Sequence, residues 1–469
     1  MDMSEEKKFT YLEELEASEK MDASYDAAHE KFDEKREKAR EKRRQAMRAE
    51  RRRKARKRQI LIAYSLRAAI AAVFILAAVF VIRFAVGFSK KAQAKNQEVT
   101  VSAAANQAAE NTPAAVSSTV SSAVTLSASS EAAGSSGITD WTYTSSDTAP
   151  SGDIVATDNA VYTYDQMEKD LYFLEQRYSD KIKIKKFGTT ADSRDLLDVV
   201  VGPDSATKDV IIQYSMHGRE YINSLLGMKQ LEEYLKGWDS SEYGGNKYSE
   251  LVQDVRLHII PMMNPDGVSI SESGVDAIRD ASLKSGLMAC YQSDVSLGKG
   301  DPQINAYWKT WKANARCVDL NRNFDCGWEG TVGTTQPSCS RYKGESPASE
   351  NEVKALVALK DSINCVCEIA YHSEGQKVYW DYGSTGSVKE ADQTLATTVA
   401  GLTGYTMEST VSSAQETAGC SDYFVLVCGI PAVTIETGTG DCPLAIDQWA
   451  TIWSQNTQVL PAIAQMFSS

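Results

Sequence analysis

Three short apolar runs of the chain each end at a residue whose side chain can bind a metal or move a proton. They are residues 210–216 before His217, residues 365–371 before His372 and residues 430–435 before Glu436. Runs of this length predict buried strands. Open α/β sheets build their sites at the carboxyl ends of strands, so we expect the three side chains to point at one location. The predicted fold class is α/β, a mixed twisted sheet with helices on both faces.

His217 is followed three residues later by Glu220, and residues 222–235 then have helical apolar spacing. Both side chains therefore lie at a strand-to-helix junction. A catalytic zinc takes three protein ligands, commonly two histidines and a carboxylate, and leaves one position for water. We predict one Zn²⁺ per domain, bound by His217, Glu220 and His372. Glu436, which binds no metal, would be the general base that takes a proton from water and returns it to the leaving amine.

Each of these pieces alone is weak evidence. His258 lies within residues 255–259, an apolar run, and is predicted to be a strand residue rather than a ligand. The pair Asn321 and Arg322 could be a solvated turn, and Glu436 could cap the end of a strand. The order and spacing of all the pieces together favour catalysis.

From about residue 160 to 469 the chain resembles the zinc carboxypeptidase family of the carboxypeptidase A type. The matching blocks are residues 217–220, 264–267, 318–324, 342–350, 372–373 and 434–436. The resemblance implies the same zinc ligands and the same base. It also implies that Arg322, helped by Asn321, binds the carboxylate of the leaving residue, a task that suits a guanidinium. Arg219 would line the acyl side of the cleft, and Asp319 would orient His217.

Two positions depart from the family's pattern. Lys312 stands where the best-known members have the arginine that polarises the scissile carbonyl, and lysine still offers a charged donor to the oxyanion. Ungapped counting from Glu436 places Ala414 at the position of the mobile lid tyrosine. Tyr405 or Tyr423 would substitute only if the loop is rearranged, so no residue is assigned that role.

Residues 311–316, 371–375 and 378–380 resemble the bacterial γ-D-glutamyl-diaminopimelate peptidases. The predicted function is therefore a membrane-anchored zinc metallopeptidase acting on peptidoglycan stem peptides at the γ-D-Glu-diaminopimelate bond. One alternative is an extracytoplasmic metallocarboxypeptidase that removes C-terminal residues from ordinary peptides. Another is a non-catalytic wall-binding module, which Glu436 argues against because binding needs no base.

The chain before the peptidase domain divides into three predicted parts. They are a charged cytoplasmic tail at 1–58, a transmembrane segment at 60–88 and a disordered Ala/Ser/Thr-rich linker at 89–151, followed by the peptidase domain at 152–469. Residues 68–82 form an unbroken apolar run. A span needs about 20 residues, so Arg67 or Arg83 would lie near the interface. A cleaved signal peptide and a buried helix are the competing interpretations.

Charge predicts the orientation of the span. Residues 35–58 carry 15 Lys and Arg, against Lys90, Lys91 and Lys95 after the span. The positive-inside rule then places the N-terminus in the cytoplasm and the catalytic domain outside the cell, with the membrane lipid as one partner. The basic run could instead bind nucleic acid. The net charge of −13 makes the outer domain acidic, which argues against a nucleic acid partner. The oligomeric state is left open.

All nine cysteines follow residue 289, which suits a disulfide-permissive compartment. Their odd number leaves at least one thiol free or paired between chains. Cys326 and Cys339 flank a Gly-rich loop and are a predicted bridge, with residues 420, 428 and 442 as further candidates. Cys365 and Cys367 are predicted to pack in a strand.

The predicted topology is tested by limited proteolysis of intact protoplasts. Protease added outside should cut the Ala/Ser/Thr-rich linker and release the C-terminal domain, because exposed linkers are the preferred sites of cleavage. The released fragment is identified by its mass. If the C-terminal domain is cleaved off only after the protoplasts are lysed, the domain lies inside the cell and the predicted orientation is wrong.

Overall fold

The computed structural model describes residues 137–410 and 418–468. The predicted tail at 1–58, the predicted span at 60–88 and most of the predicted linker lie outside the described residues, and these assignments stay predictions. Within the part of the chain that the structure describes, no helix combines the length and the apolar character needed to cross a membrane.

The described residues form a nine-stranded mixed sheet in the order β1-β2-β3-β7-β4-β8-β11-β9-β10. Its strands are β1 (Thr139–Asp140), β2 (Ile182–Thr189), β3 (Asp195–Val201), β4 (Lys208–Tyr214), β7 (Val255–Ile260), β8 (Cys365–Ser373), β9 (Lys377–Asp381), β10 (Thr406–Ser409) and β11 (Ala432–Thr437). Strands β7, β4, β8 and β11 run parallel to one another. A separate pair consists of β5 (Glu242–Tyr243) and β6 (Asn246–Lys247). The predicted mixed sheet is confirmed.

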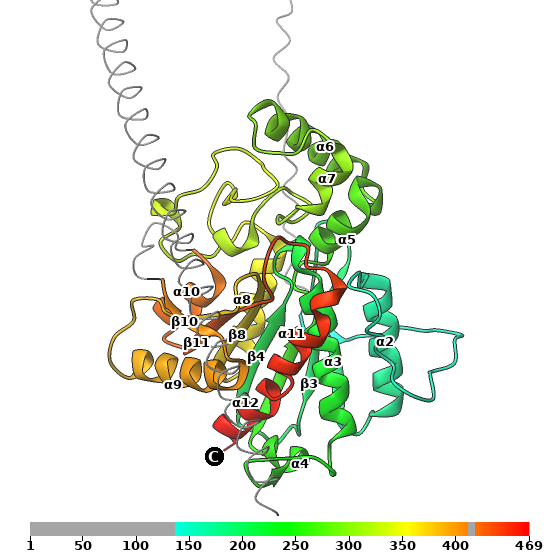
Figure 1. Cartoon of the computed structure of the whole chain (residues 1–469), viewed down its shortest axis with the longest axis vertical. Helices are drawn as coiled ribbons and strands as arrows, with labels where there is room; N and C mark the ends of the chain where they lie inside the picture. The colour runs from blue at the N-terminus through cyan, green and yellow to red at the C-terminus, as the bar shows by residue number, and fades with distance from the viewer. Residues whose placement is uncertain (1–136, 411–417, 469) are drawn as a thin grey trace, which may run out of the picture. The chain divides into compact units, whose positions relative to one another are not determined.

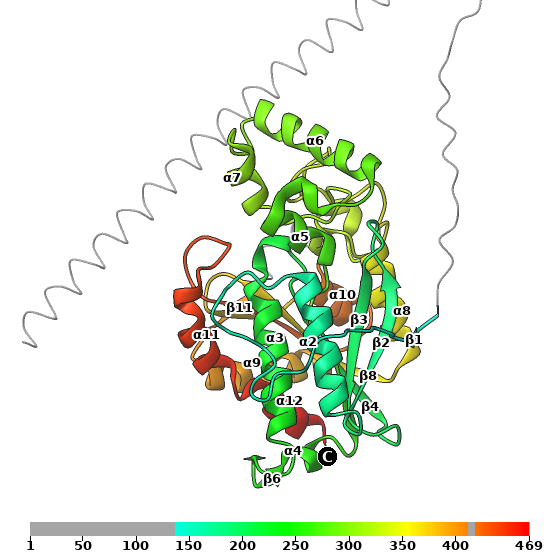
Figure 2. The ribbon, with the colours of Figure 1, turned by 90° about the vertical axis from the view of Figure 1, so that its right-hand side faces the viewer.

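Helices cover both faces of the sheet, as predicted (Figure 1). They are α2 (Tyr164–Arg177), α3 (Ile222–Lys236), α4 (Tyr248–Leu251), α5 (Pro265–Ser273), α6 (Ala281–Ser296), α7 (Ile304–Lys309), α8 (Asn351–Ser362), α9 (Gly386–Thr403), α10 (Cys420–Leu426), α11 (Trp449–Asn456) and α12 (Val459–Phe467). Figure 2 shows α2 and α3 on one side of strands β2 and β3 and α8 on the other. Figure 1 shows α5, α6 and α7 gathered beyond one end of the sheet.

Strand side chains alternate between two hydrophobic cores. On β8, Cys367, Ile369 and Tyr371 belong to the core shared with α2, α3, α9, α11 and α12. On the neighbouring β4, Ile211 packs instead into the core shared with α8 and α10. Because side chains alternate along a strand, Glu368, Ala370 and His372 face that second core. The candidate site therefore lies on the α8 and α10 side of the sheet.

The folded domain begins before residue 152, which corrects the predicted linker boundary. Thr139 and Asp140 form β1 and pair antiparallel with β2, at the edge of the sheet. Trp141 is 7% exposed, and its ring stacks on that of Tyr143. The Ala/Ser/Thr-rich composition concealed this strand because two aromatic residues supply the apolar surface that docks it.

The predicted bridge between Cys326 and Cys339 is wrong, and all nine thiols are free in this structure. The two sulfurs belong to different surroundings. Cys339 lies beside Cys290, and its backbone N–H donates to Asp294 at 2.9 Å. Cys326 instead lies close enough to Cys428 for that thiol to influence its pKa. Cys326 and Cys339 flank the same Gly-rich loop in the sequence, but their side chains do not meet in the fold.

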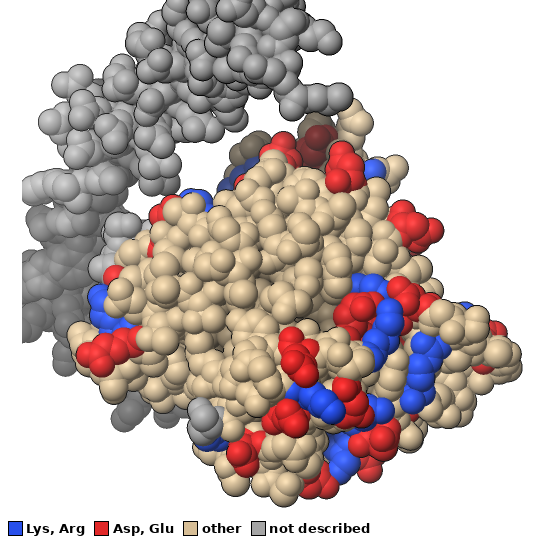
Figure 3. Space-filling model, turned by 60° about the horizontal axis from the view of Figure 1, so that its bottom comes forward, with Lys and Arg blue, Asp and Glu red and all other residues tan. Residues whose placement is uncertain are grey.

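Charges of both signs are interleaved on the surface. Figure 3 shows Lys and Arg side chains among Asp and Glu side chains on one part of the face in view, while a broad area of that face carries neither. The exposed pairs include Lys183 with Asp204 and Lys236 with Glu233. The face in view therefore offers no continuous basic surface.

His258 lies in β7 and is buried, so its prediction as a strand residue is confirmed. Its ring nitrogens contact two buried carboxylates, Nδ1 with Asp198 Oδ2 at 2.7 Å and Nε2 with Asp209 Oδ1 at 3.0 Å. Burial opposes a charge on the imidazole, but the two carboxylates outweigh it and raise the pKa of His258 to about 9. The protonated ring joins β3, β4 and β7 across the centre of the sheet.

This arrangement predicts a pH-dependent contribution to stability. Because the pKa of His258 rises on folding from 6.5 to about 9, the stabilisation is fully present below pH 6.5 and is lost as the pH rises through about 9. His258→Gln should lower the free energy of unfolding by roughly 3–5 kcal/mol at pH 6 and by less at pH 10. Urea unfolding of wild type and variant at both pH values measures this difference in the free energy of unfolding.

The matched control is Lys183→Gln, which removes an exposed ion pair and should leave the unfolding transition unchanged at both pH values. If His258→Gln destabilises the protein equally at pH 6 and pH 10, His258 is neutral in the folded protein and the assignment of its charge is wrong.

Candidate active site

The turn after β4 is held in place by its backbone. His217 precedes the 3₁₀ turn Gly218–Glu220, which leads directly into α3. The N–H of Gly218 donates to the carbonyl of Lys312 at 3.2 Å. A Cβ atom at Gly218 would lie 2.2 Å from the carbonyl oxygen of Gly267 in α5, so only glycine fits there. This close approach fixes the direction in which His217 and Glu220 project.

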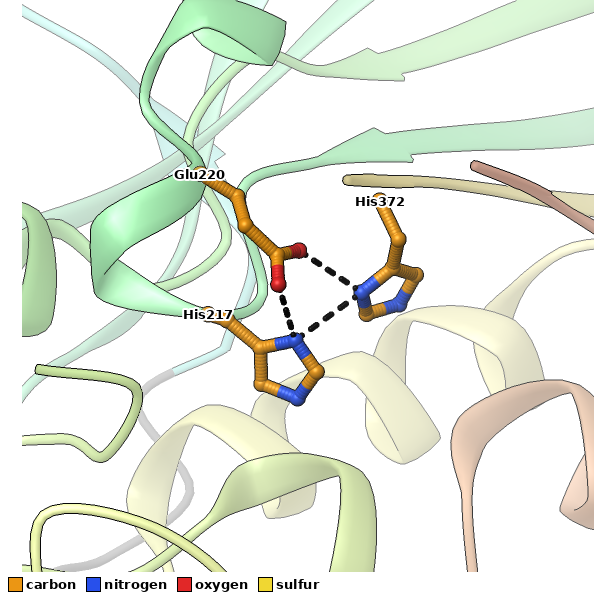
Figure 4. Close-up of side chains that lie close together, drawn as sticks. All are labelled: His217, Glu220 and His372. Carbon is orange, nitrogen blue, oxygen red and sulfur yellow. Dashed lines mark hydrogen bonds and ion pairs between the residues drawn. The ribbon is translucent and has the colours of Figure 1, made fainter. Parts of the chain in front are cut away.

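Three buried side chains converge at the carboxyl ends of β4 and β8 (Figure 4). His217 Nδ1 lies 2.9 Å from Glu220 Oε1, and His372 Nδ1 lies 3.0 Å from Glu220 Oε2. The two Nδ1 atoms are 3.1 Å apart. The structure therefore brings the three residues predicted as metal ligands into mutual contact.

The donor set fits a zinc ion. Two imidazole nitrogens and a carboxylate oxygen all lie within 4.8 Å of one another, and this is the combination that catalytic zinc sites commonly use. Burial by itself would raise the pKa of Glu220, but His217, His372 and Lys312 hold it well below its ordinary value. The carboxyl group is thus ionised, as a metal ligand must be.

Asp319 lies behind His217, as the resemblance implied. Its Oδ1 atom is 3.3 Å from His217 Nε2, and its Oδ2 atom accepts the backbone N–H of Arg341 at 2.9 Å. Burial opposes ionisation, yet His217, Arg322 and Lys312 hold the pKa of Asp319 well below its usual range. A fixed negative charge at Nε2 keeps the proton on that nitrogen and leaves Nδ1 free to bind a metal.

Glu436 lies next to His372 because β11 and β8 are parallel and in register at these two residues. Neighbouring strands are about 4.8 Å apart, so both side chains reach the same end of the sheet. Glu436 Oε2 has no hydrogen-bond partner among the described residues. Burial, followed by the negative charge of Glu220, raises the pKa of Glu436 to about 7. A carboxyl group with this pKa and a vacant oxygen suits proton transfer near neutral pH.

Two cations lie close to the three converging residues. Lys312 Nζ is 3.7 Å from Glu220 Oε1, and its side chain is 25% exposed, so it can also meet a substrate. Arg219 lies in the same 3₁₀ turn as Glu220, and its buried Nε atom has no hydrogen-bond partner among the residues that the structure describes. The roles predicted for Lys312 and Arg219 stay predictions.

Asn321 and Arg322 lie in the 3₁₀ turn Leu320–Arg322. Asn321 Oδ1 accepts the backbone N–H of Cys420 at 2.8 Å. Because the oxygen is used in this contact, the donor end of the amide is the end available to a carboxylate. Arg322 Nη1 donates to the carbonyl of Asn321 at 3.0 Å and lies close enough to Asp319 and Asp422 to affect both carboxyl groups. This pair remains the candidate carboxylate-binding site.

Several supporting residues were not anticipated from the sequence. Asn223, Ser373 and Thr437 form a closed triangle of hydrogen bonds, with distances of 3.0 Å, 2.9 Å and 2.8 Å. It joins α3 to the ends of β8 and β11. Lys377 on β9 pairs in register with Glu436. The only sequence signal was the position of these polar residues within a few residues of His217, His372 or Glu436.

The lid tyrosine is still unassigned. The hydroxyl of Tyr405 is held by Gln455 at 3.0 Å and by Asn456 at 3.1 Å. The ring of Tyr423 packs against Phe324. Ala414, the position that ungapped counting indicated, lies outside the described residues.

With this geometry established, the relationship to known proteins is clear. Residues 167–457 match the family model described as zinc carboxypeptidase, which is more than half of the chain. The chain belongs to the zinc carboxypeptidase family. A catalytic zinc ion is the cofactor of this family, and the site described above fits it.

The chain is similar to proteins of bacteria and of animals. Gamma-D-glutamyl-L-diamino acid endopeptidase 1 of Lysinibacillus sphaericus is 27% identical over 297 residues, which cover 63% of this chain and 70% of that protein. Mast cell carboxypeptidase A of Rattus norvegicus is 24% identical over 216 residues, which cover 45% of each chain. The crystal structure of thrombin activatable fibrinolysis inhibitor matches with a TM-score of 0.52 and 17% identity over 68% of this chain and 77% of that chain, which shows a shared fold.

The three-residue zinc centre predicts the metal content of variants. The purified protein should hold one zinc ion per chain, and His372→Ala should lose it because two ligands hold zinc far more weakly than three. Elemental analysis after dialysis measures the content without reference to activity. His258→Gln, which changes a histidine outside the cluster, should keep its zinc. Stoichiometric zinc in His372→Ala would remove His372 from the ligand set.

Proposed function

We propose that this chain is a membrane-anchored zinc peptidase that hydrolyses the γ-D-glutamyl-diaminopimelate bond of peptidoglycan stem peptides outside the cell. Peptidase chemistry is supported by one observation above all. His217, Glu220 and His372 converge beside Glu436, which is the only arrangement in the described residues that joins a zinc donor set to an unligated carboxyl group. The substrate class is supported by the similarity to the endopeptidase of Lysinibacillus sphaericus.

The residues around the site divide the reaction between them. Zinc, when bound, acts as a Lewis acid and makes a water molecule easier to deprotonate. Glu436 takes the proton of the attacking water at Oε2 and delivers it to the nitrogen of the leaving amine as the C–N bond breaks. Lys312 offers a positive charge to the carbonyl oxygen while negative charge develops on it.

Recognition of the leaving residue falls to Asn321 and Arg322. They would bind the α-carboxylate of a residue at the end of a stem peptide, with the amide and guanidinium hydrogens as donors. This requires that a carboxylate lie about one residue beyond the cleaved bond. A terminal diaminopimelate satisfies the requirement.

Arg219 favours a substrate whose acyl group is a γ-linked D-glutamate. A γ-linked D-glutamate carries its own α-carboxylate beside the scissile bond, where an ordinary L-peptide has a neutral amide. That carboxylate needs a cation in a partly desolvated site. Arg219 has a buried Nε atom with no hydrogen-bond partner among the described residues, so it can supply the charge.

A second function, removal of C-terminal residues from ordinary peptides, is favoured by the similarity to mast cell carboxypeptidase A. The carboxylate-binding pair serves the last residue of any L-peptide equally well. The two functions therefore differ on the acyl side of the scissile bond, where only the γ-linked substrate presents an extra carboxylate to Arg219.

The two functions are separated by comparing substrates. L-Ala-γ-D-Glu-diaminopimelate should be cleaved with release of diaminopimelate, and hippuryl-phenylalanine and hippuryl-arginine should be cleaved far more slowly. Product masses and kcat/KM values measure it. Comparable kcat/KM on both classes would reduce the assignment to a carboxypeptidase of broad specificity.

Two variants serve as controls in the same assay. Glu436→Gln is nearly isosteric and should lower turnover by roughly 10²-fold or more while keeping its zinc. Arg219→Gln should slow the γ-linked substrate selectively, because only that substrate presents a carboxylate to residue 219.

A further inference from the structure

Three buried cysteines lie together between α6 and the segment that leads to Asp319. Cys290 is on α6, Cys317 follows the turn that begins at Asn314, and Cys339 lies in the loop before α8. The three thiols are not among the groups of described residues whose ligand atoms converge closely enough to hold a metal ion. The chemistry open to them is therefore that of thiols.

Cys290 and Cys317 are the two that are in direct contact. Cys317 Sγ lies 4.0 Å from the carbonyl oxygen of Gly286 on α6. Cys290 follows Gly286 by one helical turn and so lies on the same face of α6. The thiol of Cys317 is hydrogen-bonded to Cys290, and this contact, together with burial, holds the pKa of Cys317 well above its ordinary value. Cys339 is held differently, because its thiol and its backbone N–H both bond to Asp294.

A cavity connects the two sulfurs to the outside. It has a volume of about 400 Å³, lies between α6 and residues 315–317 and 336–337, and is lined by both Cys290 and Cys317. Its other walls are mainly apolar and include Leu283 and Pro337. Cavities of this size accept small molecules. A small apolar reagent can therefore reach the pair, although each of the two cysteines is only 3% exposed.

The backbone at Cys317 needs support from its surroundings. Its φ of 61° lies in the left-handed region, which residues other than glycine rarely adopt. Asn314 holds the turn, because its side-chain oxygen accepts two backbone N–H groups of the turn at 3.0 Å and 3.1 Å. Asp319, Asn321 and Arg322 follow directly along the chain. A bond from Cys317 to α6 would fix the start of the segment that carries these three side chains.

We propose that Cys290 and Cys317 are a modification site, at which a disulfide-bonded oxidant joins the two sulfurs and so ties the segment of the carboxylate-binding pair to α6. First, the thiolate of one cysteine attacks a sulfur of the oxidant, which forms a mixed disulfide and releases one thiol. The other cysteine then attacks the protein sulfur, which forms the Cys290–Cys317 bond and releases the second thiol. The two cysteines lose two protons and two electrons, and the oxidant is reduced to two thiols. Oxidising surroundings outside a cell maintain such bonds.

The test treats reduced, folded, full-length protein in detergent with 2,2′-dithiodipyridine, a small apolar disulfide. The remaining thiols are alkylated, and the protein is digested with trypsin without reduction. Trypsin separates the three sulfurs, because Cys290 falls in residues 285–299, Cys317 in residues 317–322 and Cys339 in residues 323–341. The mass of residues 285–299 joined to residues 317–322 is expected, and it should disappear on reduction.

The same mapping is applied to protein refolded from denaturant in a mixture of oxidised and reduced glutathione, which reaches the sulfurs before the cavity forms. If residues 317–322 are joined instead to residues 323–341, the pairing is wrong. If neither treatment joins residues 285–299 to residues 317–322, the modification site does not exist.

The bridge should also stabilise the domain. Joining residues 290 and 317 restricts the unfolded chain, so the oxidised protein should unfold roughly 5 °C above the reduced protein. Amide hydrogen exchange in residues 318–322 should be slower in the oxidised protein, because the start of that segment is held to α6. Equal exchange in the two forms would show that the bond does not hold the segment.

Two variants show whether this pair is responsible. Cys290→Ser should lose both the joined peptides and the difference in unfolding temperature between oxidised and reduced protein, and Cys317→Ser gives the same test if Cys290→Ser does not fold. Cys428→Ser removes a partly exposed thiol elsewhere and should keep both. A temperature difference that persists in Cys290→Ser and Cys317→Ser would assign it to another pair.

These readouts need neither a substrate nor the zinc ion. A protein that cleaves γ-linked substrates but never joins the two cysteines would lose the bridge and keep the proposed function. A protein that joins them but cleaves no γ-linked substrate would keep the bridge and lose the proposed function.

Discussion

The register of parallel strands is the constraint on which the rest of the site depends. Tyr214 at the end of β4 lies opposite Tyr371 on β8, and His372 lies opposite Glu436 on β11. The three strands therefore end at one level, with the residues after them adjacent in space. A slip of one residue between β8 and β11 would turn Glu436 toward the opposite core. Metal binding and proton transfer are thus tied to the backbone pairing at the centre of the sheet.

Concentrating charge at this level has an electrostatic cost that the surrounding side chains offset. Glu220 and Asp319 are buried carboxylates, and each is held ionised by imidazole and amino groups of the site. Buried charges are tolerated when they are paired and hydrogen-bonded. The uncharged triangle of Asn223, Ser373 and Thr437 adds order beneath them without adding charge. The hydrogen-bonded triangle thus supports the strand ends that carry the metal ligands.

The sequence predicted those parts of the site that depend on strand ends. His217, His372 and Glu436 each follow an apolar run that predicts a buried strand. The sequence alone therefore predicted that all three lie at strand ends. His258 was separated from the ligands by the same argument. These predictions needed only local pattern and the general rule for parallel sheets.

The remaining features depend on contacts between distant segments. The docking of β1 through Trp141 and the separation of Cys326 from Cys339 follow from packing that no local pattern reports. Glu368 is the clearest case. In the sequence it is one acidic residue within an apolar strand, and its neutral partners come from α10, more than fifty residues later, and from Gln213 on β4.

The distribution of charge along the site follows from these contacts. Three cationic side chains lie at the catalytic level, namely Arg219, Lys312 and Arg322. Deeper along β8 the hydrogen-bond partners of Glu368 are neutral, and burial raises the pKa of Glu368 to about 7, so this carboxyl group is only partly ionised near neutral pH. The same sheet that aligns the metal ligands thereby keeps the fully ionised carboxylates at the catalytic level and a weakly ionised one away from it.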